Sequence, residues 1–146
     1  MKIVMEQQRE LQETEVRIRY QELSEQVKNI RAVLHAMDTN IAGKCDGNVY
    51  QLNTAEIYYI ESVDKRTYIY CKNQVYETGE RLYQLEEKLI DSGFVRVSKK
   101  CIVNKYKLKG MKILPNSHIE AMLSNGEKLL VTRKYISEIR KALERK

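Results

Sequence analysis

The sequence is poor in several residue types that mark particular classes of protein. It has no tryptophan, one proline (Pro115) and two histidines among 146 residues. Its three cysteines, Cys45, Cys71 and Cys101, are far apart and form no C-x-x-C pair, which argues against a disulfide framework and against a zinc site. We expect these thiols to act as small hydrophobic side chains.

Long apolar runs are missing as well. No stretch approaches the roughly 20 apolar residues that a transmembrane helix needs. The N-terminus turns acidic at Glu6, which does not fit a secretory signal peptide. We therefore expect a cytoplasmic protein.

Signatures of catalysis are also absent. Neither His35 nor His118 has a serine, cysteine or carboxylate nearby in a pattern that suggests a catalytic dyad. The chain contains no glycine-rich phosphate loop and no metal-ligand spacing. The sequence therefore predicts no enzyme activity, no cofactor and no bound metal.

What the sequence has in excess is positive charge in its second half. The formal net charge is +6, and from Arg96 to Lys112 there are seven Lys or Arg residues and no Asp or Glu. A field of one sign over so short a stretch favours a partner with many negative charges, such as a nucleic acid.

Residues 1–44 read as an extension that precedes the main domain. Residues 2–5 and 16–20 alternate like short strands, and an amphipathic helix follows. Apolar residues recur on that helix at spacings of three and four, and they must bury against the following domain or a second copy; they are Leu23, Val27, Ile30, Val33, Leu34 and Met37. We place the domain boundary in the loop at 44–48, where glycine and aspartate occur.

Residues 45–146 show the pattern of closely spaced strands. Leu82, Leu85 and Leu89 define a short middle helix that ends before Gly93, and a last helix runs from Arg133 to about residue 145. The predicted fold is mostly antiparallel β with these two helices. The strand candidates are residues 49–52, 57–63, 67–71, 75–78, 94–97, 101–103, 107–114, 118–123 and 128–132, with turns that include Asn116-Ser117 and Asn125-Gly126.

Three pairs of cations stand between predicted elements of this domain. They are Lys65-Arg66, Lys99-Lys100 and Arg133-Lys134. Any one pair is explained equally well as solvated surface charge, but three such pairs at the edges of a β core favour polyanion binding. The tyrosines at 58, 59, 68 and 70 fall in strands, where packing is a better explanation than base stacking.

The order of these motifs resembles that of the LytTR DNA-binding domain. The resemblance covers roughly residues 45–144 and rests on Ile57-Tyr58-Tyr59-Ile60-Glu61-Ser62, the leucines of the middle helix, Phe94-Val95-Arg96-Val97-Ser98-Lys99, Ile102-Val103-Asn104, Asn125-Gly126 and Val131-Thr132-Arg133-Lys134-Tyr135. It implies an elongated antiparallel β fold in a bacterial transcription regulator. It also implies that loops, instead of a recognition helix, enter successive major grooves of DNA that bears direct repeats.

The resemblance also assigns residues to roles. Base readout is expected of the loop 64–67, through Lys65, Arg66 and Thr67, and of Lys99 and Arg133. Phosphate or supporting contacts are expected of Ser98, Lys100, Asn104, Lys105, Lys107, Lys134 and Tyr135. Lys100 departs from the small hydroxyl residue usual at its position, and Asn104 suits the holding of a turn as well as a contact to DNA.

The short extension resembles that of stand-alone members of the family, which lack a receiver domain and are often encoded beside a small membrane protein. A homodimer through Leu23, Val27, Ile30 and Leu34, or a regulatory membrane-protein partner, is therefore expected. Two other classes stay open. An RNA-binding protein would share the positive charge, and a protein–protein adaptor would act through the N-terminal helix.

Overall fold

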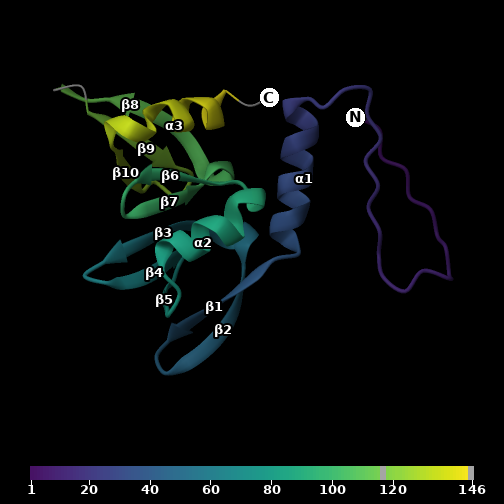
Figure 1. Ribbon diagram of the computed structural model, residues 1–146, viewed down its shortest axis with the longest axis horizontal. Helices are drawn as coiled ribbons and strands as arrows, with labels where there is room; N and C mark the ends of the chain where they lie inside the picture. Colours follow the sequence, from purple (N-terminus) through teal and green to yellow (C-terminus); the bar gives the residue numbers. More distant parts are fainter. Residues whose placement is uncertain (116–117, 145–146) are drawn as a thin grey trace.

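The computed structural model describes residues 1–115 and 118–144, and within them the strands form two antiparallel sheets (Figure 1). The larger sheet has the order β2-β1-β5-β4-β3-β7-β6, and the smaller has the order β10-β9-β8. The mostly antiparallel β fold predicted from sequence is confirmed. The strands are β1 Asn40–Cys45, β2 Asn48–Asn53, β3 Ile57–Val63, β4 Arg66–Cys71, β5 Val75–Thr78, β6 Phe94–Ser98, β7 Cys101–Asn104, β8 Leu108–Ile113, β9 Ile119–Leu123 and β10 Lys128–Val131.

Three α-helices accompany the sheets. They are α1 Glu25–Met37, α2 Leu82–Leu89 and α3 Ile136–Leu143, and short 3-10 helices occur at η1 Thr54–Glu56, η2 Ile90–Ser92, η3 Lys105–Lys107 and η5 Arg133–Tyr135. The predicted middle helix and C-terminal helix are both present. The last helix begins with a 3-10 turn at Arg133, and its predicted end at residue 145 lies outside the described residues.

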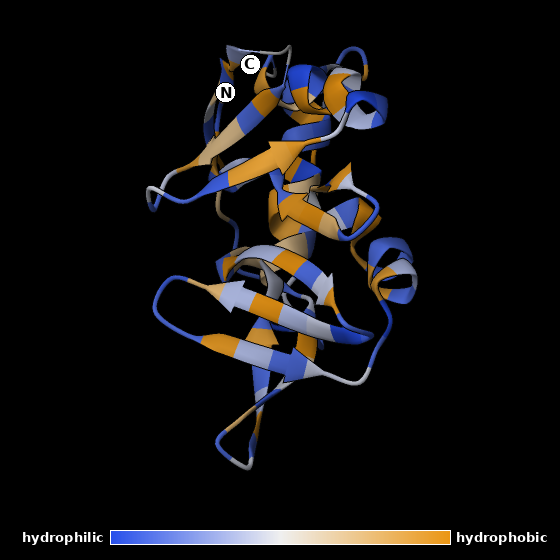
Figure 2. Cartoon of the chain, turned by 90° about the vertical axis from the view of Figure 1, so that its left-hand side faces the viewer, coloured by the Kyte–Doolittle hydropathy of each residue, from blue (hydrophilic) through white to orange (hydrophobic). Residues whose placement is uncertain are grey.

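The core lies on both faces of the larger sheet, because successive side chains of a strand point to opposite faces. Figure 2 shows hydrophobic and hydrophilic residues interspersed along the strands. On β7, Cys101 and Val103 join a cluster with the smaller sheet and α3, whereas Ile102 joins a cluster with α2. The helix α2 packs against the second cluster through Leu82, Leu85 and Leu89. The helix α3 packs against the first cluster through Ile139 and Ala142. The larger sheet, which carries the turns at Lys65-Arg66 and Lys99-Lys100, is therefore packed on both sides.

The helix α1 packs on the domain through small residues, which the sequence did not predict. Ala32 and Ala36 are buried, whereas Leu23 and Met37 of the predicted apolar stripe are exposed. The hydroxyl of Tyr106 donates to the carbonyl oxygen of Asn29 at 3.2 Å. Alanines allow close approach of the helix backbone to η2, so the large apolar residues lie on a different face, away from the domain.

Two expectations about the N-terminal segment are corrected by the structure. Residues 2–5 and 16–20, predicted as strands, adopt no regular structure, and all of them except the half-buried Ile18 are exposed. A strand needs a neighbour to pair its backbone groups, and no strand among the described residues pairs with these. The loop expected at 44–48 shrinks to the turn Asp46-Gly47, because β1 already pairs with β2 through Lys44 and Val49. Residue 44, the predicted end of the extension, lies in β1 of this hairpin, and the division of the chain at that point stays a prediction.

Two further turns bear on the predicted hairpins. Gly126 has a φ of 91° between the paired strands β9 and β10, so the hairpin expected at Asn125-Gly126 is confirmed. The turn expected at Asn116-Ser117 lies outside the described residues. Among the helices of residues 1–115 and 118–144, none is long and apolar enough to cross a membrane.

Candidate nucleic-acid interface

The first cationic loop is the tight turn between β3 and β4. Asp64 and Lys65 both have positive φ values, 49° and 68°, which is the arrangement of a two-residue hairpin turn that matches the strand twist. Val63 pairs with Arg66 across it. Lys65 and Arg66 are exposed, whereas Thr67 is only 3% exposed. Two of the three expected base-reading side chains are therefore at the surface, and Thr67 is part of the packing.

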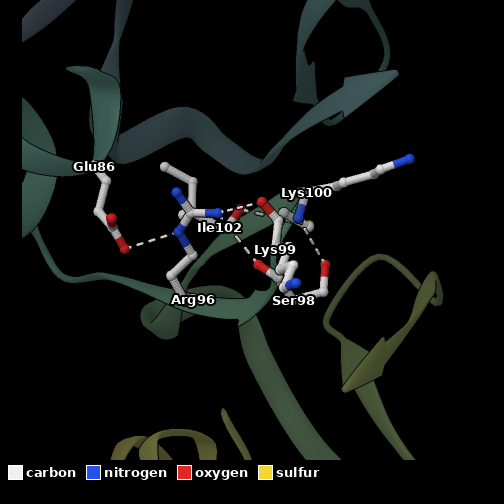
Figure 3. A network of polar contacts seen from close by, with 7 residues as sticks. Glu86, Arg96, Ser98, Lys99, Lys100 and Ile102 are labelled. Atoms are coloured by element: carbon white, nitrogen blue, oxygen red, sulfur yellow. Dashed lines mark hydrogen bonds and ion pairs between the residues drawn. The ribbon is translucent and has the colours of Figure 1, made fainter. Parts of the chain in front are cut away.

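The second cationic loop is the turn between β6 and β7. Lys99 and Lys100 are exposed, and the amide of Lys100 donates to the hydroxyl oxygen of Ser98 at 3.2 Å. The guanidinium of Arg96 donates to the carbonyl oxygens of Ser98 and Lys99, and its Nε donates to Glu86 Oε2 at 2.9 Å (Figure 3). The side chain of Lys100 extends away from this network (Figure 3).

Sequence reasoning missed Arg96 and Glu86. Arg96 alternates with Val95 and Val97, which is the pattern of any solvent-facing residue in a half-buried strand. Its side chain is in fact only 16% exposed. A charged group with so little contact with water needs a partner, and Glu86 supplies it from α2.

The third cationic loop connects β10 to α3. The amide and the hydroxyl of Thr132 both donate to the carbonyl oxygen of Val97, at 3.0 and 3.4 Å. These bonds tie the start of the loop to the strand that ends at the second loop. Arg133 and Lys134 are exposed, and Tyr135 packs against the core while the ammonium of Lys134 lies 5.6 Å from its ring centroid.

The three loops lie along one edge of the molecule, the left-hand edge in Figure 1, and Figure 2 looks onto that edge. Among the described residues, no acidic side chain forms an ion pair with Lys65, Lys99, Lys100, Arg133 or Lys134. Arg66 pairs with Glu77 at 3.9 Å, but both side chains are exposed, so the pair is weak. We name the loops 64–66, 98–100 and 132–134 together the cationic edge.

Other predicted residues lie at the opposite end of the same strands. Asn104 is 2% exposed; its side chain donates to the carbonyl oxygen of Ile57 at 2.9 Å and accepts from the amide of Tyr106 at 3.0 Å. Lys105 donates to the side chain of Asn29 on α1. These residues hold the fold and the N-terminal helix, far from the cationic edge.

Lys107 is also at that opposite end. Its ammonium lies 4.9 Å from the ring centroid of Tyr58, a residue near the start of β3, whereas Lys65 follows the end of that strand. Strands rise by about 3.3 Å per residue, so the two positions are roughly 20 Å apart. The structure therefore brings Lys65, Lys99 and Arg133 to one edge and leaves Lys105 and Lys107 out of it.

The buried thiol behind the second cationic loop carries no negative charge at neutral pH. Cys101 directly follows Lys100, and burial raises the pKa of its thiol well above the ordinary value. The thiol stays protonated, so it does not offset the field of that loop. Burial, with the nearby Glu127 as a second cause, also raises the pKa of the Tyr59 hydroxyl, which lies near the start of β3, toward the opposite end from Lys65.

Comparison with known proteins identifies this arrangement. The family model of the LytTr DNA-binding domain matches residues 47–144, from the start of β2 to the end of α3. The chain belongs to the LytTR family of DNA-binding domains. The resemblance inferred from sequence motifs is confirmed, and the family is one of DNA-binding domains, not of enzymes.

A solved LytTR structure supports the same conclusion. The LytTr DNA-binding domain of a response regulator from Bacillus cereus superposes with a TM-score of 0.66 at 25% identity, and the match covers 72% of this chain and 96% of that one. The family model leaves out residues 1–46, which contain the N-terminal extension.

Curated relatives match beyond the LytTR domain. An uncharacterised HTH-type transcriptional regulator of Staphylococcus aureus (strain NCTC 8325 / PS 47) is 26% identical over 120 residues, which is 79% of this chain and 81% of the relative. Another, from strain MSSA476, is 26% identical over 133 residues, or 90% of each chain. An alignment of that length reaches well into residues 1–46, so those relatives carry a comparable N-terminal segment.

Proposed function

We propose that this LytTR protein is a bacterial transcription regulator that reads specific DNA sequences by inserting the cationic edge into successive major grooves. The observation that carries the proposal is the placement of three exposed, cationic loops on one edge, with acidic partners absent from their lysines and from Arg133 among the described residues. A duplex offers anionic phosphates along a groove wide enough for such loops.

Roles within the edge follow from side-chain chemistry. Arg133, Lys99, Lys65 and Arg66 are the base-reading residues, because Arg and Lys bond to the O6 and N7 atoms of guanine. Lys100 and Lys134 contact phosphates, which position the protein without reading sequence, and Ser98 supports its loop. Lys105, Lys107, Asn104 and Thr67 are left out of the contact set on account of their positions.

Helices are not the reading element in this proposal. The three α-helices of the described chain are separated from one another by strands, although the staphylococcal relatives are named HTH-type regulators. In contrast to a helix–turn–helix protein, this chain offers turns at the ends of strands. Two copies of the chain, each inserting its loops into one repeat, suit direct repeats about one helical turn apart, which is the expected form of the operator.

The alternative of RNA binding receives less support. Single-stranded RNA is usually read by exposed aromatic rings on which bases stack. Tyr58 and Tyr59 are buried, and the Tyr59 ring stacks on that of Tyr70 with 4.2 Å between centroids. These rings are committed to packing within the sheet.

The proposal is tested by selecting binding sites from a random duplex pool at near-physiological salt and footprinting the enriched sequence. We expect two short direct repeats about one helical turn apart, with protection in successive major grooves. Enrichment of no motif, together with binding that vanishes on a modest rise in salt, would reduce the cationic edge to a general polyanion surface. Preference for single-stranded RNA over duplex DNA in competition would favour the alternative.

We further propose that the protein acts in the cytoplasm as a homodimer formed through the outer face of α1. Val27, Ile30 and Leu34 lie on the face opposite Ala32 and Ala36, and none of them is buried. Leu23 directly precedes the N-cap of the helix and is exposed. A continuous apolar stripe of this kind favours association with an equivalent stripe, and two copies match an operator of two repeats.

The dimer is tested by the double substitution V27K/I30K, measured by light scattering. We expect the molecular mass to fall to that of one chain while the melting temperature of the domain changes little. The control is Q7K/Q8K, which adds the same charge at exposed residues of the N-terminal tail. A monomeric wild-type chain would refute the dimer and direct attention to a membrane-protein partner as the occupant of this face.

A further inference from the structure

Two loops of the cationic edge are held in place by arginines that bond to their backbone. Arg81 donates from Nη1 to the carbonyl oxygen of Lys65 at 3.2 Å. Arg96 donates to the carbonyl oxygen of Lys99, and to that of Ser98 at 3.3 Å. In both cases an acceptor is the backbone carbonyl oxygen of a proposed base-reading lysine. Each arginine therefore fixes the position of the backbone from which that lysine side chain extends.

Both arginines are connected to α2. Arg81 is the residue at the N-cap of α2, and its amide donates to Gln84 Oε1 at 2.8 Å. Glu86, within α2, accepts from Arg96 Nε at 2.9 Å. The helix itself is anchored by the buried Leu82, Leu85 and Leu89. One short, firmly packed helix is thus linked to the first loop through one arginine and to the second loop through another.

The third loop joins the same framework through β6. Thr132 bonds to the carbonyl oxygen of Val97, the residue that follows Arg96. A movement of the β6 end would therefore shift the Ser98–Lys100 turn and the start of the Arg133 loop together. The positions of the three loops are therefore coupled to one another.

Glu86 has a specific electrostatic role in this framework. An arginine beside a DNA-facing loop is an attractive phosphate ligand, and a phosphate contact would pull the guanidinium off the Lys99 carbonyl. The short Glu86–Arg96 bond, with Arg96 mostly shielded from water, keeps the guanidinium directed inward (Figure 3). The carboxylate lowers the total positive charge, yet it preserves the loop geometry.

We propose that α2 is a brace that presets the spacing of the DNA-reading loops, with Arg81, Glu86 and Arg96 as positioning residues for sequence recognition. This inference rests on the proposed function of the cationic edge. It predicts that loss of the Glu86 carboxylate weakens specific binding even though the protein becomes more positive, because base readout depends on geometry whereas phosphate attraction depends on charge.

The test compares Glu86→Gln with Glu87→Gln. Both substitutions remove one negative charge from α2, but Glu87 is exposed, and among the described residues its side chain forms no hydrogen bond or ion pair with the three loops. Dissociation constants are measured on the selected operator and on a scrambled duplex at one salt concentration. We expect E86Q to lower the ratio of specific to nonspecific affinity by about tenfold, the usual effect of losing a charged hydrogen bond, and E87Q to leave that ratio unchanged.

A second variant and a coupling measurement exclude a general loss of folding. Arg96→Lys keeps the charge and loses the planar fork of donors, so we expect it to lower the same ratio while the melting temperature stays within a few degrees. In a Lys99→Ala background, E86Q should lower the ratio by clearly less than tenfold, because part of its effect acts through Lys99. A full and independent tenfold loss in that background would overturn the brace and make Glu86 a general stabiliser.

Hydrogen exchange in the free protein separates this inference from the proposed function. The amide of Lys100 bonds to Ser98, and the amide of Ser62 donates to the carbonyl oxygen of Lys100 at 2.8 Å. We expect both amides to exchange faster in E86Q than in E87Q, whether or not an operator exists. Faster exchange without any selected motif would sustain the brace and reject sequence reading, whereas equal exchange in the two variants would overturn the brace.

Discussion

Lysines occur at both ends of the larger sheet, but they are exposed at one end and contact other parts of the protein at the other end. At the cationic edge, Lys65 and Lys99 extend into solvent from tight turns. At the opposite end, Lys105 donates to Asn29 of α1 and Lys107 lies over the ring of Tyr58. The sequence presents all of these as one basic field. The fold divides them into cations that are available to a ligand and cations that are used to hold the molecule together.

This division shows why charge count alone does not locate an interface. A lysine that bonds to a neighbouring element has little freedom to reach a phosphate, and its ammonium is already solvated by protein oxygens or by a ring. A lysine on a hairpin turn has no such partner. The position of a cation relative to the strand ends decides which of the two it becomes.

The largest expected effect concerns the end that holds the fold. Asn104→Ala leaves the carbonyl oxygen of Ile57 and the amide of Tyr106 without their side-chain partner. We expect a loss of about 2–4 kcal/mol in the free energy of unfolding, since each unsatisfied buried group costs about 1–3 kcal/mol. Denaturant titration measures it. The exposed Asn48 is the control, and Asn48→Ala should change stability by about 0.5 kcal/mol or less. Equal, small losses would show that Asn104 is not a structural residue.

At the cationic edge the largest effect is expected from Arg133→Ala. We expect it to weaken binding to the selected operator by about 1–3 kcal/mol and binding to random duplex very little, as for a bidentate base contact. Fluorescence anisotropy on both duplexes measures the difference. Arg140, exposed on α3, gives a matched control as Arg140→Ala. Equal losses on the two duplexes would reassign Arg133 to a phosphate.

A smaller effect separates the two groups of lysines directly. Lys100→Ala should reduce the slope of log affinity against log salt by about one, because one phosphate contact releases about 0.9 counterion. Lys105→Ala should leave that slope unchanged, as its ammonium is held at α1. Affinities at four or five salt concentrations suffice for the comparison. A slope lowered equally by both substitutions would bring Lys105 back into the DNA contact set.

The smallest expected effect is that the thiols of Cys71 and Cys101 do not react with an alkylating reagent in the native protein. Burial raises the pKa of Cys71 to about 11 and that of Cys101 further. The thiolate is the reactive form and appears only as the pH approaches the pKa, so at pH 8 we expect iodoacetamide to leave both thiols unmodified in the native protein. Mass spectrometry after digestion checks this, with the unfolded chain as control. Rapid native labelling of Cys101 would mean that the strand beneath the second loop opens readily.

Much of the fold was predictable because local signals and burial agree there. The run Ile57-Tyr58-Tyr59-Ile60 is rich in strand formers and becomes the buried part of β3. Leu82, Leu85 and Leu89 share one helix face and become the anchors of α2. The segments 2–5 and 16–20 have similar alternation but no neighbouring strand, so propensity without a partner gave a wrong prediction there.

The positions of the cationic loops were predictable from sequence, and the contacts that support them were not. Pairs of cations between strand signals indicate turns, and the turns at Lys65 and Lys99 and the loop at Arg133 lie where those pairs occur. Whether Thr67 faces the core depends on strand register, and whether Arg96 turns inward depends on a carboxylate ten residues earlier in another element. Such pairings are set by tertiary packing, and neither spacing nor composition contains them.

The backbone of the first loop limits how this domain could be redirected to a new operator. Lys65 sits at a φ of 68°, a left-handed conformation that β-branched residues avoid. Valine, isoleucine and threonine are disfavoured at that position whatever base they would face, while asparagine, aspartate and glycine would be tolerated. Arg133, in an ordinary 3-10 turn, bears no such restriction. Under the proposed function, engineering of specificity is therefore best begun at Arg133, where the backbone does not limit the choice of side chain.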